Sequence, residues 1–252
     1  MYKYGVLLSV LLFSSSSMAW NCSEERTIST ELDIGAVADI RVQAGAGELS
    51  IKGSDQRGKI GLVAKLCASD ESVLSEMDVE TEIDNEYVSI ETSMPKKWSG
   101  NTSMSIDLSL VVPKGSRLDV KDSSGDLEVK GVSELTLVDS SGDIKIKNIE
   151  GKVDLADSSG SIRMAGVGEA EVADSSGAID VRDVVKDFTI NVDSSGDIEV
   201  QGVGGDVLVK VDSSGSIDVK DVAGSFTVEK DGSGGIRYDN IEGEVDIPRR
   251  KR

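Results

Sequence analysis

The feature that most constrains the fold is a tetrapeptide, Asp-Ser-Ser-Gly, that recurs every 17 to 19 residues. A fixed period of this length is typical of a solenoid, in which short coils bury one continuous core only by stacking on one another. The chain is therefore predicted to be an all-β, single-stranded β-solenoid (β-helix) with 17–19-residue coils, right-handed as linked parallel strands usually are. The six copies, and a seventh that reads Asp-Gly-Ser-Gly, begin at Asp122, Asp139, Asp157, Asp174, Asp193, Asp212 and Asp231.

Apolar residues recur at fixed offsets from each repeat Asp. Two-residue spacing among β-branched residues indicates strands. A first strand is predicted from the columns at +5, +7 and +10, which start at Leu127, Val129 and Val132. A second strand is predicted from inward pairs such as Phe188 and Ile190. Each coil is thus expected to contain two short strands and two turns, with large and small side chains alternating between coils to fill the core.

Residues 20–115 show the same alternation with a looser period. They are predicted to form larger, irregular coils that continue the solenoid and cap its end, because a terminal repeat must hide its open edge. The regular repeats occupy residues 116–247, and a basic tail, residues 248–252, follows from Pro248. Strands of the N-terminal half are expected at residues 37–42, 48–51, 59–66, 77–83, 87–91 and 104–112.

The first nineteen residues have the pattern of a secretory signal peptide. Lys3 precedes a short apolar run, and Ser17-Met18-Ala19 resembles a cleavage site, so cleavage is predicted after Ala19. The apolar run is too short to span a bilayer, and no membrane span is expected elsewhere. Cys22 and Cys67 are predicted to form a disulfide in an oxidising compartment, with two unpaired buried thiols as the alternative. These features predict an exported protein: periplasmic, on the cell surface or secreted.

The charge balance argues against one class of partner. Removal of Lys3 with the signal peptide leaves 26 of the 27 basic residues against 46 acidic ones, a net charge of −20. Bulk nucleic-acid binding is not expected at that charge. The acidity is interpreted mainly as a source of solubility, and attraction of a divalent cation is the functional alternative.

One stretch of sequence resembles a large bacterial family. It runs Val111-Val112-Pro113-Lys114-Gly115 and then Leu118-Asp119-Val120-Lys121-Asp122-Ser123-Ser124-Gly125-Asp126-Leu127. The chain is similar there to proteins named "putative adhesins" with β-strand repeats, and the similarity covers nearly the whole mature chain. The resemblance implies an extracytoplasmic β-helix, and it supplies no catalytic residues.

The residue inventory favours a protein without catalytic activity. The chain has no histidine, which removes Ser-His-Asp and Cys-His nucleophiles and imidazole acid–base chemistry. The repeated tetrapeptide is interpreted as a turn in which Asp accepts from backbone N–H groups, the serines stack and Gly takes a positive φ. Calcium is possible there without being required, and the Gly-Gly-x-Gly-x-Asp pattern of calcium-binding β-rolls is missing. No metal and no cofactor are expected.

Paired carboxylates are the remaining enzymatic alternative. Asp139 with Asp143, or Asp193 with Asp197, could serve as the acid pair of a polysaccharide lyase or glycosidase. Sugar-cleaving clefts normally offer aromatic surfaces, whereas only 4% of this chain is Phe, Trp or Tyr. Enzymatic activity is therefore not expected.

Two sets of residues are candidates for binding. The column at offset +8, on the outward face of the first strand, contains Lys130, Lys147, Arg182 and Lys220. It is interpreted either as part of a ladder of ion pairs with the mixed +6 column or as a track for an anionic polymer such as an acidic polysaccharide. The second set is an exposed-looking loop with Lys96, Lys97 and Trp98.

The sequence as a whole predicts an exported, non-catalytic, adhesin-like element that binds or scaffolds within the bacterial cell envelope. Its expected partners are an envelope polysaccharide or another surface protein. Self-assembly of the rods into a filament is the first alternative, and a lyase or glycosidase is the second.

Overall fold

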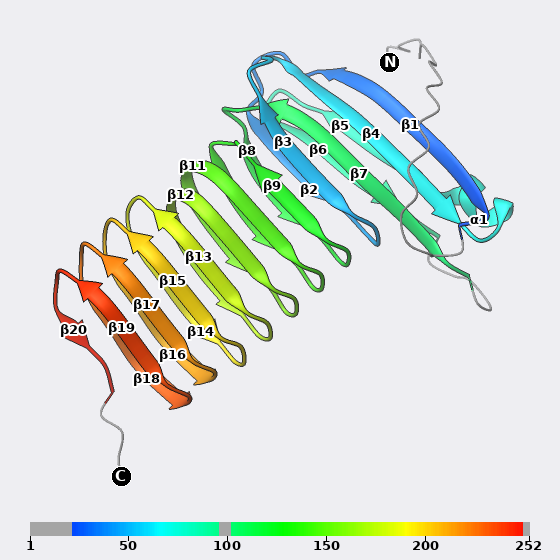
Figure 1. Cartoon of the computed structure of the whole chain (residues 1–252). Helices are drawn as coiled ribbons and strands as arrows, with labels where there is room; N and C mark the ends of the chain where they lie inside the picture. Colours follow the sequence, from blue (N-terminus) through cyan, green and yellow to red (C-terminus); the bar gives the residue numbers. More distant parts are fainter. Residues whose placement is uncertain (1–21, 96–101, 249–252) are drawn as a thin grey trace.

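The chain forms an all-β solenoid in this computed structural model, which describes residues 22–95 and 102–248 (Figure 1). The predicted fold class is confirmed. The coils stack along a rod, with the N-terminal half at one end and the last described coil at the other. The predicted signal peptide and residues 249–252 of the basic tail lie outside the described residues.

Two sheets face each other across the core, and each regular coil contributes one strand to each sheet. In the first sheet, neighbouring strands are β1 (Glu24–Asp33), β4 (Lys59–Ala68), β7 (Met104–Pro113), β3 (Leu49–Ser54), β9 (Leu127–Lys130), β11 (Ile144–Ala156), β12 (Ile162–Asp174), β13 (Ile179–Val184), β15 (Ile198–Val203), β17 (Ile217–Val222) and β19 (Ile236–Ile241). In the second sheet they are β5 (Asp78–Ile83), β6 (Tyr87–Ser93), β2 (Asp39–Gln43), β8 (Arg117–Lys121), β10 (Glu134–Val138), the second halves of β11 and β12, β14 (Phe188–Asp193), β16 (Val207–Ser214), β18 (Phe226–Ser233) and β20 (Val245–Asp246).

The regular coils pair in register, so residues with the same offset lie side by side. Ile198, for example, pairs with Ile179 on one side and Ile217 on the other, and all three are 1% exposed. In the second sheet, Val207 lies between the fully buried Phe188 and Phe226. The predicted alternation of large and small side chains is therefore present. Burying a side chain of this size stabilises the fold by roughly 1.5 to 3 kcal/mol relative to leaving it exposed.

The turn glycines explain why the tetrapeptide is repeated. Gly196 has a φ of 149°, and a Cβ added to it would lie 1.6 Å from the carbonyl oxygen of Gly177 in the preceding coil. Stacked turns leave no room for a side chain there. Serines also link the stack: the Ser214 hydroxyl, for instance, donates to the Ser194 carbonyl at 3.1 Å. The expected roles of Gly and Ser in this turn are both present.

The N-terminal half differs in part from the larger coils that the sequence predicts. β2 and β3 do continue the solenoid, since they pair in parallel with β8 and β9. β4, in contrast, runs antiparallel to β7, β1 runs antiparallel to β4, and β5 runs antiparallel to β6. Alternating apolar residues specify which side chains face the core, but they do not specify in which direction a strand runs.

The predicted disulfide between Cys22 and Cys67 is confirmed. The two Cα atoms are 5.4 Å apart, and the bridge closes a loop with a sequence separation of 45. It ties the chain just before β1 to the end of β4. The short helix α1 (Glu71–Glu76), which the sequence analysis did not predict, follows β4 with Asp70 as its N-cap, whose carboxylate accepts from the Ser72 backbone N–H at 2.7 Å.

Candidate functional site

The basic column predicted at offset +8 is one continuous row on the outer face of the first sheet. Lys130 pairs with Lys147 on the neighbouring strand, and the row continues through Ala165, Arg182, Gln201 and Lys220. We call Lys52, Lys130, Lys147, Arg182 and Lys220 the basic line. Adjacent strands are about 4.8 Å apart, so the line extends on the order of 30 Å along the rod.

Lys52 is a member of the basic line that the sequence analysis missed. It lies on β3 and pairs directly with Lys130 on β9. The sequence does contain a pattern that could have revealed Lys52. The segment Ala46-Gly47-Glu48-Leu49-Ser50-Ile51, which precedes it, looks like a degenerate repeat. Aligning Leu49 with offset +5 places Lys52 at +8.

Acidic residues of the +6 column pair with the basic line, as the ion-pair interpretation predicts. The Nζ atom of Lys220 lies 3.1 Å from the Oδ1 atom of Asp218, and the Nε atom of Arg182 lies 2.9 Å from the Oδ1 atom of Asp180. The hydrogen bond from Lys220 holds the pKa of Asp218 below its usual value, and Arg237 lowers it further against the opposing effect of burial. The side chains of Lys220 and Arg182 are 43% and 52% exposed, so each pair contributes at most about 1 kcal/mol to stability.

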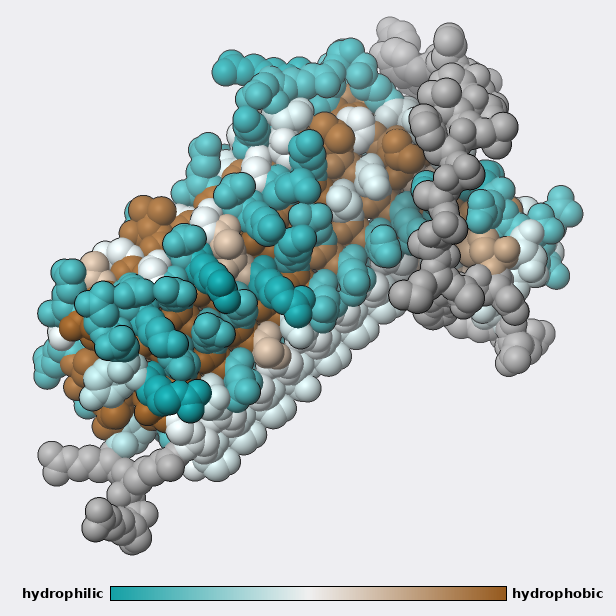
Figure 2. Space-filling model, viewed as in Figure 1, coloured by the Kyte–Doolittle hydropathy of each residue, from teal (hydrophilic) through white to brown (hydrophobic). Residues whose placement is uncertain are grey.

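Positive charge is densest on β9, β11 and β12. The +6 column is itself basic on β11 and β12, where Lys145 and Arg163 lie beside Lys130 and Lys147 of the basic line. Glu128 and Asp143 are the acids that contact this group: Lys145 Nζ lies 3.8 Å from Glu128 Oε1, and Arg163 donates to Asp143 at 3.1 Å. Hydrophilic side chains are spread along the rod, with hydrophobic surface showing between them (Figure 2).

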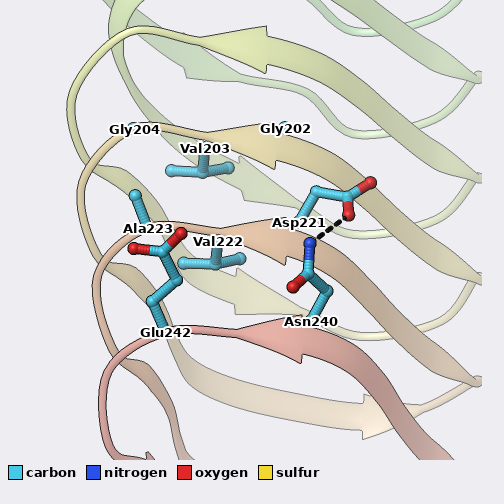
Figure 3. Close-up of a pocket in the computed structure, with 8 residues that line it drawn as sticks. All are labelled: Gly202, Val203, Gly204, Asp221, Val222, Ala223, Asn240 and Glu242. Carbon is cyan, nitrogen blue, oxygen red and sulfur yellow. Dashed lines mark hydrogen bonds between the residues drawn. The ribbon is translucent and has the colours of Figure 1, made fainter.

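A hollow of about 290 Å³ lies near the last described coils, at the turn that follows the first strand (Figure 3). The side chains of Val203 and Val222 lie between a polar side, formed by Asp221 and Asn240, and Glu242 on the opposite side. On the polar side, Asp221 accepts from Asn240 at 2.8 Å and from Gln201 at 3.0 Å. These hydrogen bonds lower the pKa of Asp221, that from Asn240 most strongly, so the carboxylate on this side of the hollow is already satisfied.

The hollow reveals a second repeating turn that the sequence analysis did not identify. Every residue at offset +9 has a φ between 54° and 76°. Gly, Asn and Asp are the residues that tolerate left-handed backbone, and only those three residue types occur at offset +9. This restriction is a sequence pattern from which the turn could have been predicted. Its members are Gly131, Asn148, Gly166, Asp183, Gly202, Asp221 and Asn240.

The repeated aspartates differ most from expectation. We call the seven of them, Asp122, Asp139, Asp157, Asp174, Asp193, Asp212 and Asp231, the Asp column.

Six members of the Asp column, all but Asp231, are at most 6% exposed, a burial that the turn interpretation did not predict. The expected hydrogen bonds from the turn reach good geometry at Asp157, which accepts from Ser158 N at 2.7 Å, and at Asp174, which accepts from Ser176 N at 3.2 Å. At Asp139, Asp193 and Asp212, backbone N–H groups of the turn serines lie close enough to lower the pKa, but neither carboxylate oxygen forms a hydrogen bond with them. Burial outweighs this effect and raises the pKa of all six buried members.

The carboxylate pairs weighed as an enzymatic alternative are split between the interior and the surface. Asp139 is 1% exposed, whereas Asp143 is exposed and accepts from the Ser161 backbone N–H at 3.1 Å. Asp193 is fully buried, and its partner Asp197 accepts from Ser216 N at 2.9 Å. In each pair one carboxyl thus faces the core while the other is tied to the next coil.

Comparison with known proteins identifies the family. The family model described as Toastrack DUF4097 matches residues 11–200. The chain belongs to the Toastrack DUF4097 family. No curated protein matches it in sequence.

Several solved structures resemble this Toastrack chain. One is named a "putative cell adhesion protein" from Clostridium sporogenes, with 16% identity, a TM-score of 0.37, and coverage of 89% of this chain and 99% of that one. Another is a "putative adhesin" from Bacteroides fragilis, with 17% identity, a TM-score of 0.41 and coverage of 88% and 97%. A third is a "putative lipid binding protein" from Parabacteroides distasonis, with 17% identity, a TM-score of 0.46 and coverage of 90% and 98%.

The other predicted binding set falls in a part of the Toastrack chain without described structure. Lys96, Lys97 and Trp98 lie in residues 96–101, outside the described residues. Within residues 22–95 and 102–248, no group of three or more acidic or cysteine side chains is placed to hold a metal ion. The same residues include no helix that is long and apolar enough to cross a membrane.

Proposed function

We propose that this Toastrack protein is an exported, non-catalytic, adhesin-like element that binds or scaffolds within the bacterial cell envelope, and that the basic line binds an anionic polymer such as an acidic envelope polysaccharide. The observation that carries this proposal is the in-register placement of Lys52, Lys130, Lys147, Arg182 and Lys220 on one outer face. A polymer with repeated anionic groups can contact several such cations at once. Such multivalent contact binds more tightly than any single ion pair.

The ion pairs along this face are compatible with exchange of partners. Exposed pairs contribute between zero and about 1 kcal/mol each, so a polyanion displaces the acidic +6 partners at small cost. The acidic remainder of the molecule suppresses contacts elsewhere. Binding of this kind weakens with added salt, because exposed charges are screened over about 8 Å at physiological ionic strength.

Two observations support a location outside the cytoplasm. The first is the signal-like segment at residues 1–19. The second is the disulfide between Cys22 and Cys67, because such bonds persist in oxidising compartments. The absence of histidine and the burial of Asp139 and Asp193 support a role without catalysis, since a fully buried carboxyl cannot reach a polysaccharide.

The test is binding of residues 20–252 to a panel of anionic and neutral envelope polysaccharides, with and without calcium. The variant replaces Lys130, Lys147, Arg182 and Lys220 with Ala. A matched control removes the same charge from the second sheet by changing Lys121, Lys152, Lys210 and Lys230 to Ala. The proposal predicts binding that the first variant loses and the control retains. Equal loss in both variants, or no binding to any anionic polysaccharide, would contradict it.

Self-association is a second candidate, favoured by the last described coil. Among the described residues, β19 and β20 each pair with a strand on one side only. Ile236 and Ile241 are half-buried there, and Tyr238 is 48% exposed. Unpaired strand edges with apolar side chains promote association. Light scattering over rising concentration should then show elongation that Tyr238→Lys abolishes, and a constant monomer mass would exclude this candidate.

A further inference from the structure

Three buried members of the Asp column are unusual, because acidic side chains are seldom buried without partners. Asp193 is 0% exposed, Asp139 is 1% exposed and Asp212 is 2% exposed. Neither carboxylate oxygen of these three residues has a hydrogen-bond donor in the described structure. An ionised carboxylate in such a position lacks the water and the cations that normally stabilise it.

Members of the Asp column face one another across neighbouring strands. Asp174 pairs in register with Asp193, Asp193 with Asp212, and Asp212 with Asp231. Neighbouring strands are about 4.8 Å apart, which brings successive carboxyls within reach of each other. Burial, together with the neighbouring Asp231 carboxyl, raises the pKa of Asp212. A hydrogen bond between two such carboxyls requires a proton on one of them, because ionised carboxylates only accept hydrogen bonds.

No basic side chain in the described structure pairs with the six buried members of the Asp column, Asp122, Asp139, Asp157, Asp174, Asp193 and Asp212. The ion pairs that the described residues form with one another involve other acids, such as Asp143, Asp180 and Asp218. The charged groups that act on Asp193 are Asp174 and Asp212, and those that act on Asp157 are Asp139 and Asp174. Asp139 acts on Asp122, and Asp231 acts on Asp212. The remaining groups that face these carboxyls are backbone N–H groups of the turn serines.

We propose that the Asp column is a pH-sensitive device in which neighbouring carboxyls of successive coils share protons, so that the coils are tied together in acidic surroundings and repel one another once the protons are lost. A protonated carboxyl donates one hydrogen bond and still accepts others. A stack of them can therefore satisfy itself along the rod. The fully ionised stack places like charges side by side in a dry interior, where their repulsion is least screened.

The direction of the pH dependence follows from the burial of the carboxyls. Burial and the neighbouring carboxyls raise the pKa of Asp122 and Asp193 from 3.8 to about 7, and that of Asp157 and Asp212 to about 6. The folded chain therefore holds protons that the unfolded chain has released between about pH 4 and pH 7. The stabilisation that these protonated carboxyls contribute to the fold is complete below about pH 4 and is lost as the pH rises through 6 to 7.

Asp193→Asn in residues 20–252 tests the proposal, because Asn has the shape of a neutral carboxyl and cannot ionise. Thermal unfolding is followed from pH 4.5 to pH 8.5. The difference in melting temperature, variant minus unchanged chain, should increase by several degrees from pH 4.5 to pH 8.5. Asp119→Asn, on an exposed side chain of β8, is the control and should show no such pH-dependent difference.

A second measurement keeps the proposal falsifiable if Asp193→Asn does not fold. Carboxyl ¹³C NMR of the unchanged protein should show Asp193 titrating near neutrality, well above exposed aspartates. Titration of Asp193 in the ordinary acidic range would overturn the proposal. So would an Asp193→Asn variant that is destabilised equally at every pH. Stabilisation of the unchanged protein by calcium at pH 8, lost in Asp193→Asn, would also overturn it, because the column would then bind a cation in place of protons.

Discussion

The repeat half of this Toastrack protein and its N-terminal half solve the same problem in different ways. In the repeat half, each coil covers its neighbour with residues of the same offset, as Ile179, Ile198 and Ile217 show. In the N-terminal half, antiparallel strands, a helix and a disulfide close the end of the stack. Register thus closes each coil against the next in one half, whereas specific local devices close the end of the stack in the other.

The two ends of the rod also differ in how their strand edges are protected. At the N-terminal end, β5 presents the exposed acids Glu80 and Glu82, which discourage the pairing of another acidic chain. At the last described coil, β19 presents Tyr238 instead. The difference indicates that the N-terminal half ends the solenoid, whereas the repeat half provides the Asp column and all of the basic line except Lys52.

The largest effect that separates the halves is expected from breaking the disulfide. Replacing Cys67 with Ser releases a loop with a sequence separation of 45, and chain entropy predicts a loss of about 4 kcal/mol. Hydrogen exchange should rise in β1 and β4 while β13 and β15 stay protected. Equal loss of protection along the whole rod would show that the two halves unfold as one unit.

In the repeat half, the substitution expected to destabilise most is Gly196→Ala. The added methyl group would contact the Gly177 carbonyl oxygen, and the residue would keep a positive φ, so we expect a loss of about 3 kcal/mol. Gly115→Ala is the matched control in the N-terminal half, because a Cβ there meets nothing within 4 Å. Urea unfolding measures both, and similar losses would contradict the stacked-turn explanation.

A smaller effect should distinguish the middle of the stack from its end. Ile198→Val removes a methyl group from a side chain that is 1% exposed, and the expected cost is about 1 kcal/mol. Ile236→Val, at the same offset in the last described coil, should cost less than half as much because that side chain is only half-buried. Equal costs would indicate that another surface covers the last coil in solution, as self-association requires.

The smallest effect on stability is expected on the basic line itself. Arg182→Gln removes the ion pair with Asp180. The side chains of this pair are 52% and 35% exposed, so its loss should change the free energy of unfolding by less than about 1 kcal/mol. The same variant should weaken polysaccharide binding measurably in a salt-dependent way. A large loss of stability with unchanged binding would assign the line a purely structural role.

The regular repeats were predictable because their period carries the register. The apolar columns starting at Leu127 and Val129, and the positive φ of the turn glycines, follow from the spacing alone. The antiparallel direction of β4 was not predictable, since the alternation of its apolar residues fits either direction. The burial of Asp193 was missed for a related reason: an Asp in a turn motif suggests an exposed cap, and only the stacked coils show that its side chain faces the core.

The candidate site was predictable in outline. The offsets placed Lys130, Lys147, Arg182 and Lys220 in one row, and the pairing of the strands places them there. Lys52 was missed because its repeat is degenerate and is separated from Lys130 along the chain by most of the N-terminal half. The polymer that would occupy this row was not predictable, because the sequence specifies the cations of the row and not the molecule that binds them.

The most direct test of the account is to map where an anionic envelope oligosaccharide contacts residues 20–252, by NMR chemical-shift changes at low and high salt. The account predicts changes that follow the outer face of β3, β9, β11, β13 and β17, centred on Lys130 and Lys147, and that fade as salt is added. Changes confined to the N-terminal half or to the segment around residues 96–101, or changes that salt does not affect, would contradict the proposal that the repeat half presents the binding face.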